Sequence, residues 1–349
     1  MKQNPIRLAW FLFFRCKSLE LRSKFKKRRL LSSLKTLILY QLGLRKVNAV
    51  KKFPFYSHLV VKVHGGYRAF DFKQKTVTKF ISADSNPSKV KLEIEGIRKT
   101  NQLYFAPRIL RWNELERWYE EEYVEGPIGY ALVQSGDHVV SNLFGNEIIR
   151  CLGKMILLDF PIKVTVGEIT KKCSESWEND RLSRVEPKPE MHDAFYRFVQ
   201  QTLSKLHQNA DQTIYLIFSH GDFSFQNIII AENGLKVIDW ESIANRSVLY
   251  DLHNFFLTEL YYKRSSKSLV NDVAEAIAAL ESYLTSDNHY GITYNFDELS
   301  ETYRWLYYIE RLHMLFERGL NNQILNVIYR SIEVFMEFEK SAVKQLKCY

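Results

Sequence analysis

The sequence predicts an α+β protein of two lobes, a small antiparallel sheet followed by a larger and mostly helical part. Its 349 residues exceed most single domains and suffice for two lobes around a cleft. Three short strand patterns follow one another between residues 57 and 81, whereas helical spacing dominates 128–218 and the chain after 253. We expect a first lobe over 53–126 and a second over 127–349, preceded by an extension, 1–52.

The extension carries most of the basic charge. It holds 15 lysines and arginines and one acid, Glu20, which gives +14, so the remaining chain carries −5 of the total of +9. A basic block, Lys24–Arg29, precedes an apolar helical face that includes Leu30, Leu34 and Leu37. This pattern fits the inner face of an anionic membrane and equally a helix docked on the body. Charge confined to one segment does not favour nucleic acid as a partner.

The cysteines and the apolar runs indicate the compartment. Four scattered cysteines show no metal-ligand or redox spacing, which is typical of thiols in a reducing compartment. The apolar run Leu8–Phe14 is too short to cross a bilayer or to form the core of a secretory signal. We therefore expect a cytoplasmic protein, peripheral on the inner membrane face if the extension binds lipid.

The strands expected in the first lobe are Leu59–Val63, Ala69–Phe72 and Thr76–Ile81. The third contains Lys79 among apolar residues, and a buried ammonium must be paired with a carboxylate. A helix is expected next, from a cap at Ser88 to about Thr100. Glu93 shares the apolar face of this helix, while Glu95 points away, so Glu93 is the expected partner of Lys79 and Glu95 the alternative.

The most specific pattern lies in residues 219–241. Two apolar runs, Ile228–Ile230 and Leu235–Ile238, flank a turn at Asn233-Gly234, which predicts a β-hairpin. This hairpin would bring three polar residues to the same end of the strand pair. They are Asp222, Asn227 and Asp239.

The string His220-Gly221-Asp222, followed by Asn227 and Ile238-Asp239-Trp240-Glu241, resembles the aminoglycoside phosphotransferase and choline kinase superfamily. The resemblance implies a protein-kinase-like fold and the use of ATP and Mg²⁺. It implies that Asp222 accepts the proton of the acceptor hydroxyl and that His220 braces this loop. Asn227 and Asp239 would hold the magnesium ions. Lys79, paired with Glu93, would reach the phosphates.

The same resemblance assigns the rest of the nucleotide site. Gly65 and Gly66 would replace the longer glycine-rich loop that covers the phosphates in protein kinases. Backbone groups of Tyr123, Val124 and Glu125 would bind adenine at the hinge between the lobes, which Gly126-Pro127 ends.

Three residues further along the chain bear on the acceptor. Asp251 follows Asp239 by only twelve residues, which leaves no room for the activation segment of a protein kinase and favours a small-molecule acceptor. Asp251 itself would support the catalytic loop or cap a helix. Glu310 and Arg311, inside an apolar helix, would form a structural ion pair or line the acceptor pocket.

The expected enzyme is thus a phosphotransferase that moves the γ-phosphoryl group of ATP to a hydroxyl of a small molecule or glycan. The basic extension favours a sugar of a lipid-linked surface polysaccharide, and an aminoglycoside or choline/ethanolamine-type acceptor is the alternative. A catalytically silent nucleotide-binding scaffold at the membrane is the alternative from another class. The sequence does not indicate an oligomeric state.

Overall fold

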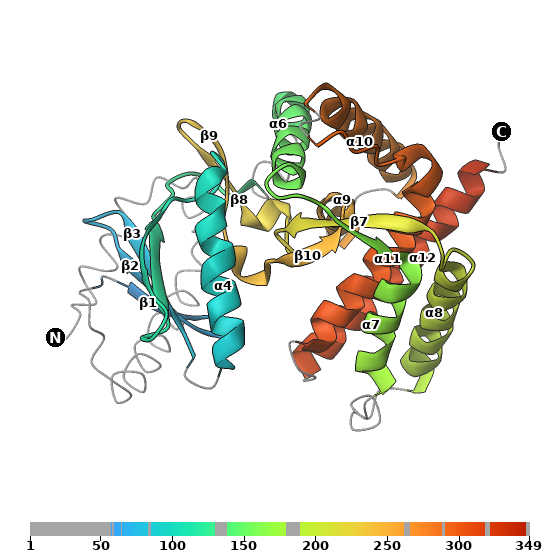
Figure 1. Ribbon diagram of the computed structural model, residues 1–349, viewed down its shortest axis with the longest axis horizontal. Coiled ribbons are helices and arrows are strands. Elements are labelled where there is room, and N and C mark those ends of the chain that lie inside the picture. Colours follow the sequence, from blue (N-terminus) through green and yellow to red (C-terminus); the bar gives the residue numbers. More distant parts are fainter. Residues whose placement is uncertain are drawn as a thin grey trace, which may run out of the picture. The chain divides into compact units, whose positions relative to one another are not determined.

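The computed structural model divides the chain into two compact units (Figure 1). The first comprises residues up to 140 together with 225–241, and the second comprises 141–224 and 242–349. The described residues are 57, 59–63, 65–82, 85–129, 138–178, 189–261, 266–287, 290–317 and 322–346. The extension over 1–52 and the expectations placed on it lie outside them. None of the helices described there is long and apolar enough to cross a bilayer.

The first unit is built on a five-stranded antiparallel sheet of order β1-β2-β3-β5-β4. Its strands are β1 (Leu59–Val63), β2 (Gly66–Asp71), β3 (Thr76–Ile81), β4 (Ile109–Asn113) and β5 (Trp118–Glu122). The predicted small antiparallel sheet is confirmed. The alternation of apolar and polar residues in these runs was sufficient to locate the first three strands to within three residues.

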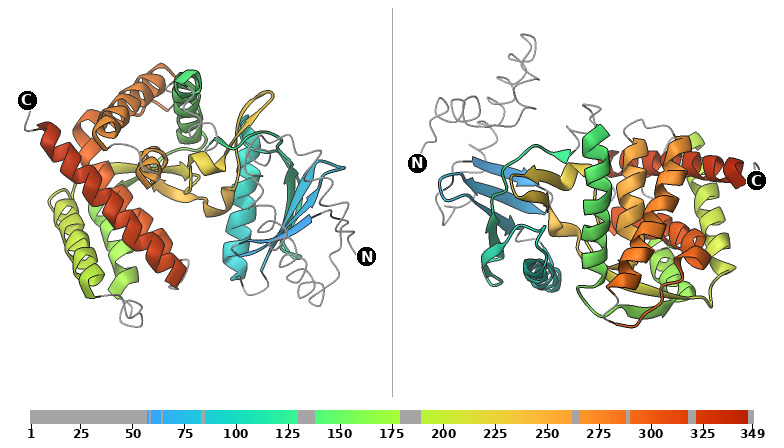
Figure 2. Two further views of the ribbon diagram at one scale, coloured as in Figure 1. Left: turned by 180° about the vertical axis from the view of Figure 1, so that it is seen from behind. Right: turned by 90° about the horizontal axis from the view of Figure 1, so that it is seen from above.

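Helix α4 (Pro87–Lys99) runs alongside this sheet and is followed by the 3₁₀ turn η1 (Thr100–Gln102) (Figure 2). It buries Val90, Ile94 and Ile97. The expected cap at Ser88 is wrong. Asn86 caps the helix, because its Oδ1 accepts the N–H of Ser88 at 2.9 Å and Pro87 fills the first helical position, where a missing N–H costs nothing.

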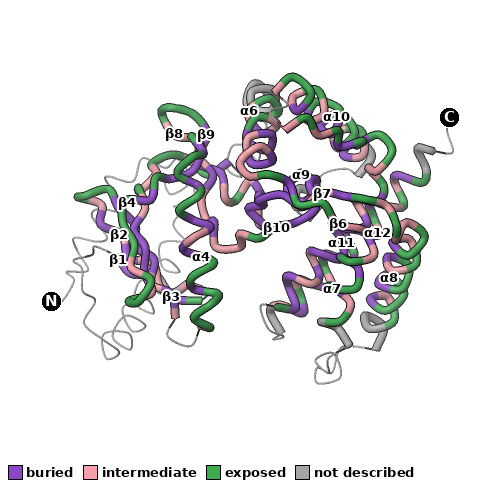
Figure 3. The backbone as a smooth tube through the Cα atoms, viewed as in Figure 1, coloured by how far each residue is buried: buried purple, intermediate pink, exposed green. Residues whose placement is uncertain are grey.

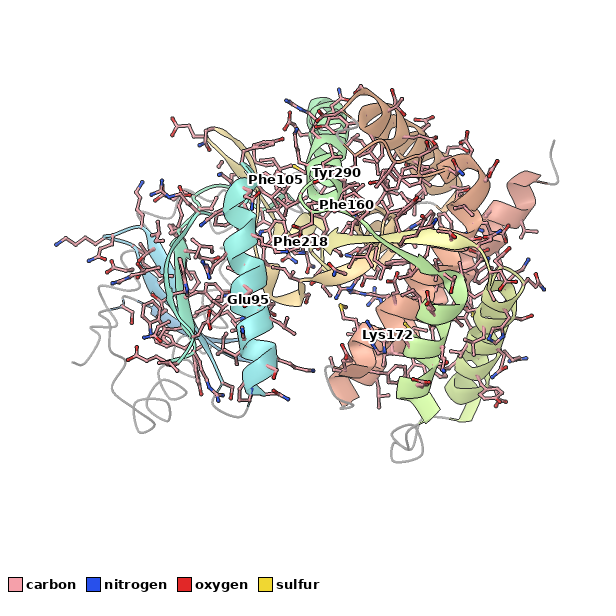
Figure 4. All side chains as sticks on the ribbon, in the orientation of Figure 1. Glu95, Phe105, Phe160, Lys172, Phe218 and Tyr290 are labelled. Carbon is pink, nitrogen blue, oxygen red and sulfur yellow. The ribbon has the colours of Figure 1, made fainter. Side chains whose placement is uncertain are left out.

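The predicted hairpin is present as β8 (Ile228–Ala231) and β9 (Gly234–Val237), between the 3₁₀ turns η3 (Phe225–Asn227) and η4 (Trp240–Ser242). It belongs to the first unit although its sequence lies far from the other strands. The N–H of Val237 donates to the carbonyl of Phe105, labelled in Figure 4, and the N–H of Ile230 donates to the carbonyl of Pro127. These backbone bonds attach the hairpin to the segments that follow α4 and β5.

The second unit combines seven helices within the described ranges with a three-stranded sheet of order β10-β7-β6. Its helices are α6 (His138–Ile156), α7 (Val166–Glu178), α8 (Pro189–His207), α9 (Tyr250–Tyr261), α10 (Ser266–Ser286), α11 (Phe296–Glu317) and α12 (Asn322–Leu346). Its strands are β6 (Ile162–Thr165), β7 (Thr213–Ser219) and β10 (Ala244–Ser247). The expectation of a mostly helical segment over 128–218 did not include β6 and β7, because periodicity alone cannot assign short apolar runs.

Helix α11 forms the core of the second unit and packs against α7, α8, α9 and α12. Figure 3 shows it buried along most of its length. Aromatic rings fill the space around it, and Tyr308 stacks on Phe335 of α12 at 4.4 Å between ring centroids. The unit therefore offers a rigid support for the residues that α9 and α11 carry.

Candidate functional site

The candidate residues fall into two groups, one in each unit. In the first unit, Lys79 on β3 is 2% exposed. Its Nζ lies 2.8 Å from Glu93 Oε1 and 2.7 Å from Glu241 Oε2. The expected pairing with Glu93 is present, while Glu95 lies 3.8 Å from Lys91 instead. Burial alone would lower the pKa of Lys79, but the two carboxylates outweigh it and raise that pKa, so the ammonium stays charged.

Arg68 lies beside Lys79 on the same face of the sheet. The two residues are direct partners in the β2–β3 register, and partners across a strand pair point to one side. The Arg68 guanidinium donates from Nη2 to Asp239 Oδ1, and its Nη2 is 3.9 Å from Glu241 Oε2. Burial would lower the pKa of Arg68, yet the neighbouring carboxylates raise it. Two cations and three carboxylates therefore form one cluster.

Asp239 adopts an unusual backbone conformation at the end of the hairpin. Its φ of 70° lies in the left-handed region, which is uncommon for a residue with a side chain and is concentrated at functional sites. The carbonyl of Asn227 accepts the N–H of Ile238 at 2.8 Å. Asn227 and Asp239 are therefore at the same end of β8 and β9, as the hairpin predicted.

The donor chemistry at this end of the hairpin fits magnesium. A carboxylate and an amide supply the oxygen ligands that Mg²⁺ takes from proteins, and substrate phosphates normally complete its shell. Within the described residues, no three His, Cys, Asp or Glu side chains gather closely enough to hold a metal by themselves. A metal at Asp239 and Asn227 would thus take water molecules or phosphate oxygens as its remaining ligands.

A further carboxyl, Glu121 of β5, lies on the same face of the sheet as Lys79, two residues beyond Tyr119, the register partner of Lys79. Although the residue as a whole is half-buried, the surrounding protein raises its pKa to about 7, chiefly through burial. Arg68 opposes this rise and Asp239 adds to it. Burial therefore favours the neutral form of Glu121 and limits the negative charge that it adds beside Asp239 and Glu241.

The residues expected at the hinge and in the glycine turn already have structural roles in the first unit. The N–H of Tyr123 already donates to the carbonyl of Lys75 at 2.8 Å. Val124 and Glu125 follow, with Glu125 exposed. Gly65 has a φ of 73°, which suits the turn between β1 and β2, whereas a Cβ on Gly66 would lie 1.8 Å from the carbonyl oxygen of Phe80. Gly66 is thus required by the sheet, and the nucleotide roles of these five residues stay predictions.

In the second unit, Asp251 holds the loop that carries Asp222. Its two carboxylate oxygens accept the N–H groups of His220 at 2.8 Å and Gly221 at 3.0 Å. The N–H of Asp222 donates to Nδ1 of the buried His220 at 3.1 Å. Asp251 therefore supports the loop, one of the two roles expected for it, and His220 braces the residue that follows Gly221.

The neighbours Glu310 and Arg311 on α11 have different partners. Glu310 accepts the N–H of Ser247 at 3.0 Å, which makes it part of the packing between α11 and β10. Arg311 donates from Nη1 to Asp222 Oδ1 at 3.2 Å. The aspartate expected to act as base thus carries an ion pair with a guanidinium whose side chain is 13% exposed.

Sequence reasoning gave no role to Arg68 or to the Glu241 side chain, and it did not connect Arg311 with Asp222. Glu241 could have been found from its place in the motif, two residues after Asp239. Arg68 could have been found from strand register, because it lies opposite Lys79. The sequence around Arg311 contains no comparable signal.

Comparison with known proteins identifies the family. Residues 73–288 match the model of the phosphotransferase enzyme family, so the chain belongs to that family. The predicted superfamily and the predicted enzyme class, a phosphotransferase with an alcohol group as acceptor, are confirmed.

Solved structures share the fold. A choline kinase from Cryptosporidium parvum is 14% identical, with 82% of this chain and 90% of that chain covered and a TM-score of 0.51. Amicoumacin kinase hAmiN, solved with AMP-PNP, Ca²⁺ and Ami, is 13% identical, with 86% and 95% covered and a TM-score of 0.51. These likenesses confirm the bilobal kinase-like fold. A search of curated proteins finds no match.

Proposed function

We propose that the protein transfers the γ-phosphoryl group of ATP to a hydroxyl group. The observation that carries this proposal is the buried Lys79, held between Glu93 and Glu241 in the unit that also presents Asn227 and Asp239 at one end of a hairpin. Family membership and the AMP-PNP and Ca²⁺ in the similar hAmiN structure support a nucleoside triphosphate and a divalent cation.

The residues of the first unit bind and orient the nucleotide. Lys79 contacts the α- and β-phosphates, and Glu93 and Glu241 fix its ammonium there. Asp239 and Asn227 would hold magnesium, which would neutralise charge on the phosphate oxygens. Backbone groups of Tyr123–Glu125 receive adenine, and Gly65 and Gly66 cover the phosphates.

The residues of the second unit orient the acceptor. Asp222 accepts a hydrogen bond from the acceptor hydroxyl and takes its proton during transfer. Phosphoryl transfer needs little assistance from a base, so the main effect of Asp222 is to aim the hydroxyl. Asp251, His220 and Arg311 fix the position of Asp222 through the bonds described above.

The charge of the chain supports the acceptor class that we propose. Fourteen net positive charges in residues 1–52 favour an acceptor at an anionic membrane surface, and we propose a sugar of a lipid-linked surface glycan. Soluble amino alcohols and aminoglycosides are the competing acceptors.

An ATP-consumption screen of the full-length protein tests this proposal. Sugars, amino alcohols and aminoglycosides would be compared, with Asp239→Ala as the matched inactive control. ATP consumption that requires an acceptor and is lost in Asp239→Ala supports a kinase. Nucleotide binding without turnover on any acceptor would favour a silent scaffold.

A further inference from the structure

Arg68 combines three features that the family membership does not explain. It lies opposite Lys79 in the β2–β3 register, so two cations share one face of the sheet. Its guanidinium pairs with Asp239, the residue assigned to the metal. Its Nε is buried, yet this donor meets no hydrogen-bond acceptor among the described residues.

We infer that Arg68 is a second phosphate-binding cation, which competes with the divalent cation for Asp239 and takes nucleotide phosphate oxygens as its alternative partner. The inference rests on the proposed function, because it uses Asp239 as a metal ligand. No covalent bond forms or breaks in this exchange, because only ionic and hydrogen-bonded partners are replaced.

The chemistry of the guanidinium supports the exchange. Its planar fork of five N–H donors fits phosphate as well as carboxylate, and bidentate geometry makes such contacts strong. A buried donor without an acceptor is costly and rare in folded proteins, so the unmet Nε donor shows that Asp239 alone does not satisfy this guanidinium.

The position of Arg68 supports it as well. Only two residues, 64 and 65, separate β1 from β2, so this turn is too short to supply the row of backbone N–H groups found in longer glycine-rich loops. A side-chain cation one strand from Lys79 would supply the missing contact to the phosphates. A metal ion and a guanidinium on the same carboxylate repel each other, which makes them competitors for Asp239.

Two binding measurements on the full-length protein separate this role from a static ion pair. Arg68→Met should bind Mn²⁺ alone more tightly than wild type, by about tenfold, because the competing cation is gone. The same variant should bind ATP in EDTA more weakly, by about ten- to hundredfold, because a charge-assisted contact to phosphate is lost. The opposite signs distinguish the exchange from general damage to the site.

Two further variants complete the test. Arg111→Met removes an arginine of the same sheet that pairs with Glu120, and should leave both affinities at the wild-type value. Arg68→Lys keeps the charge without the fork, and both of its affinities should fall between those of wild type and Arg68→Met. If Arg68→Met fails to fold, as a melting curve would show, Arg68→Lys carries the test.

The outcomes are distinct. Unchanged or weaker Mn²⁺ binding in Arg68→Met, or unchanged ATP affinity in EDTA, overturns the inference, as would an Arg68→Lys variant equal to wild type in both. Asp239→Ala measured in parallel examines the proposed function itself. Equal Mn²⁺ affinity in Asp239→Ala and wild type refutes the metal site, whereas loss in Asp239→Ala with no change in Arg68→Met contradicts only the role of Arg68.

Discussion

At the scale of single residues, the Asp222 carboxylate is the group whose removal should separate chemistry from nucleotide binding. Its side chain contacts Arg311 within the second unit, while the residues assigned to the nucleotide belong to the first. Asp222→Asn should lower kcat by about 10²–10⁴-fold and leave ATP affinity nearly unchanged, because the loss falls on the acceptor hydroxyl. Steady-state kinetics and ATP calorimetry measure both. Turnover within about tenfold of wild type would refute Asp222 as the base.

The metal ligands should behave differently from Asp222. Asp239→Ala should abolish the part of ATP affinity that depends on magnesium, because it removes the carboxylate at the end of the hairpin. Asn227→Ala should be milder, since an amide contributes no charge. ATP calorimetry with magnesium and with EDTA gives the comparison for each variant. Equal magnesium-ATP affinity in wild type and Asp239→Ala would rule out this ligand.

Contacts between single residues could be predicted only when the two residues were close in the sequence. The pair Lys79–Glu93 spans 14 positions, and helix periodicity placed Glu93 on the inner face of α4. The pair Arg68–Asp239 spans 171 positions, and no local pattern links a strand arginine to a distant loop. Motif spacing predicted Asp222, Asn227 and Asp239 as site residues, whereas the contact of Arg311 with Asp222 became visible only in the packing of α11.

At the scale of elements, the first turn of α9 holds the loop that carries Asp222. Asp251 binds two loop N–H groups, and Asn254 Nδ2 donates to the carbonyl of Phe223 at 2.9 Å. His253 lies between them in sequence, is 1% exposed and stacks on Tyr307. The stability of this helix therefore depends on whether the buried His253 ring is protonated.

Burial lowers the pKa of His253 from 6.5 to about 3, with Arg304 adding to the shift. As the pH falls below 6.5, His253 therefore becomes protonated in the unfolded chain but stays neutral in the folded chain. The free energy of unfolding is unaffected by this group well above pH 6.5, and it decreases as the pH falls from 6.5 toward 3. Between pH 7 and 5.5 the free energy of unfolding should drop by about 1.3 kcal/mol from this group.

Urea unfolding of wild type and His253→Phe at the two pH values measures the effect, since the phenylalanine ring keeps the stacking but cannot titrate. Other groups contribute equally to both proteins, so the difference in slope isolates His253. His207→Phe, at an exposed position at the end of α8, is measured alongside as a control for the loss of a surface imidazole. The same slope in His253→Phe and wild type would contradict the assignment.

Elements with strong local signals were predicted, and those defined by tertiary pairing were not. Strands β1–β3 and the hairpin β8–β9 alternate or carry a glycine turn, which fixes them locally. Strand β6 has only four residues and acquires its identity from pairing with β7. Pairing of this kind has no counterpart in the periodicity of a short run.

At the scale of the whole molecule, a contiguous stretch of 23 residues, 219–241, supplies groups to both units. Asp222 belongs to the second unit, and Asn227 and Asp239 belong to the first, because the chain enters the first unit at Phe225 and leaves it after Glu241. The expected division into two lobes at Gly126 does not include this return of the chain to the first unit. The hairpin bonds to Phe105 and Pro127 explain it, and no composition change marks it in the sequence.

The charge distribution of the whole chain leads to the last prediction. Residues 1–52 carry +14 and the remainder −5, so a membrane-binding role requires the extension and not the body. Basic residues near an anionic surface contribute up to ~1 kcal/mol each, and salt screens this attraction over about 8–10 Å. The full-length protein should therefore bind anionic vesicles and dissociate as salt rises, with a salt-resistant part from Trp10, Phe11 and the leucine face.

A chain that begins at Lys52 provides the matched control. It should remain in solution with the vesicles and keep its activity on a soluble acceptor, because the residues assigned to catalysis follow position 52. Co-sedimentation and a melting curve for both chains give the comparison. A helix docked on the body predicts the reverse: no vesicle binding by the full-length protein, and a shortened chain that melts earlier because an apolar face has lost its cover. The two measurements together decide between these roles, since electrostatic attachment changes binding without changing stability, whereas docking changes stability without requiring lipid.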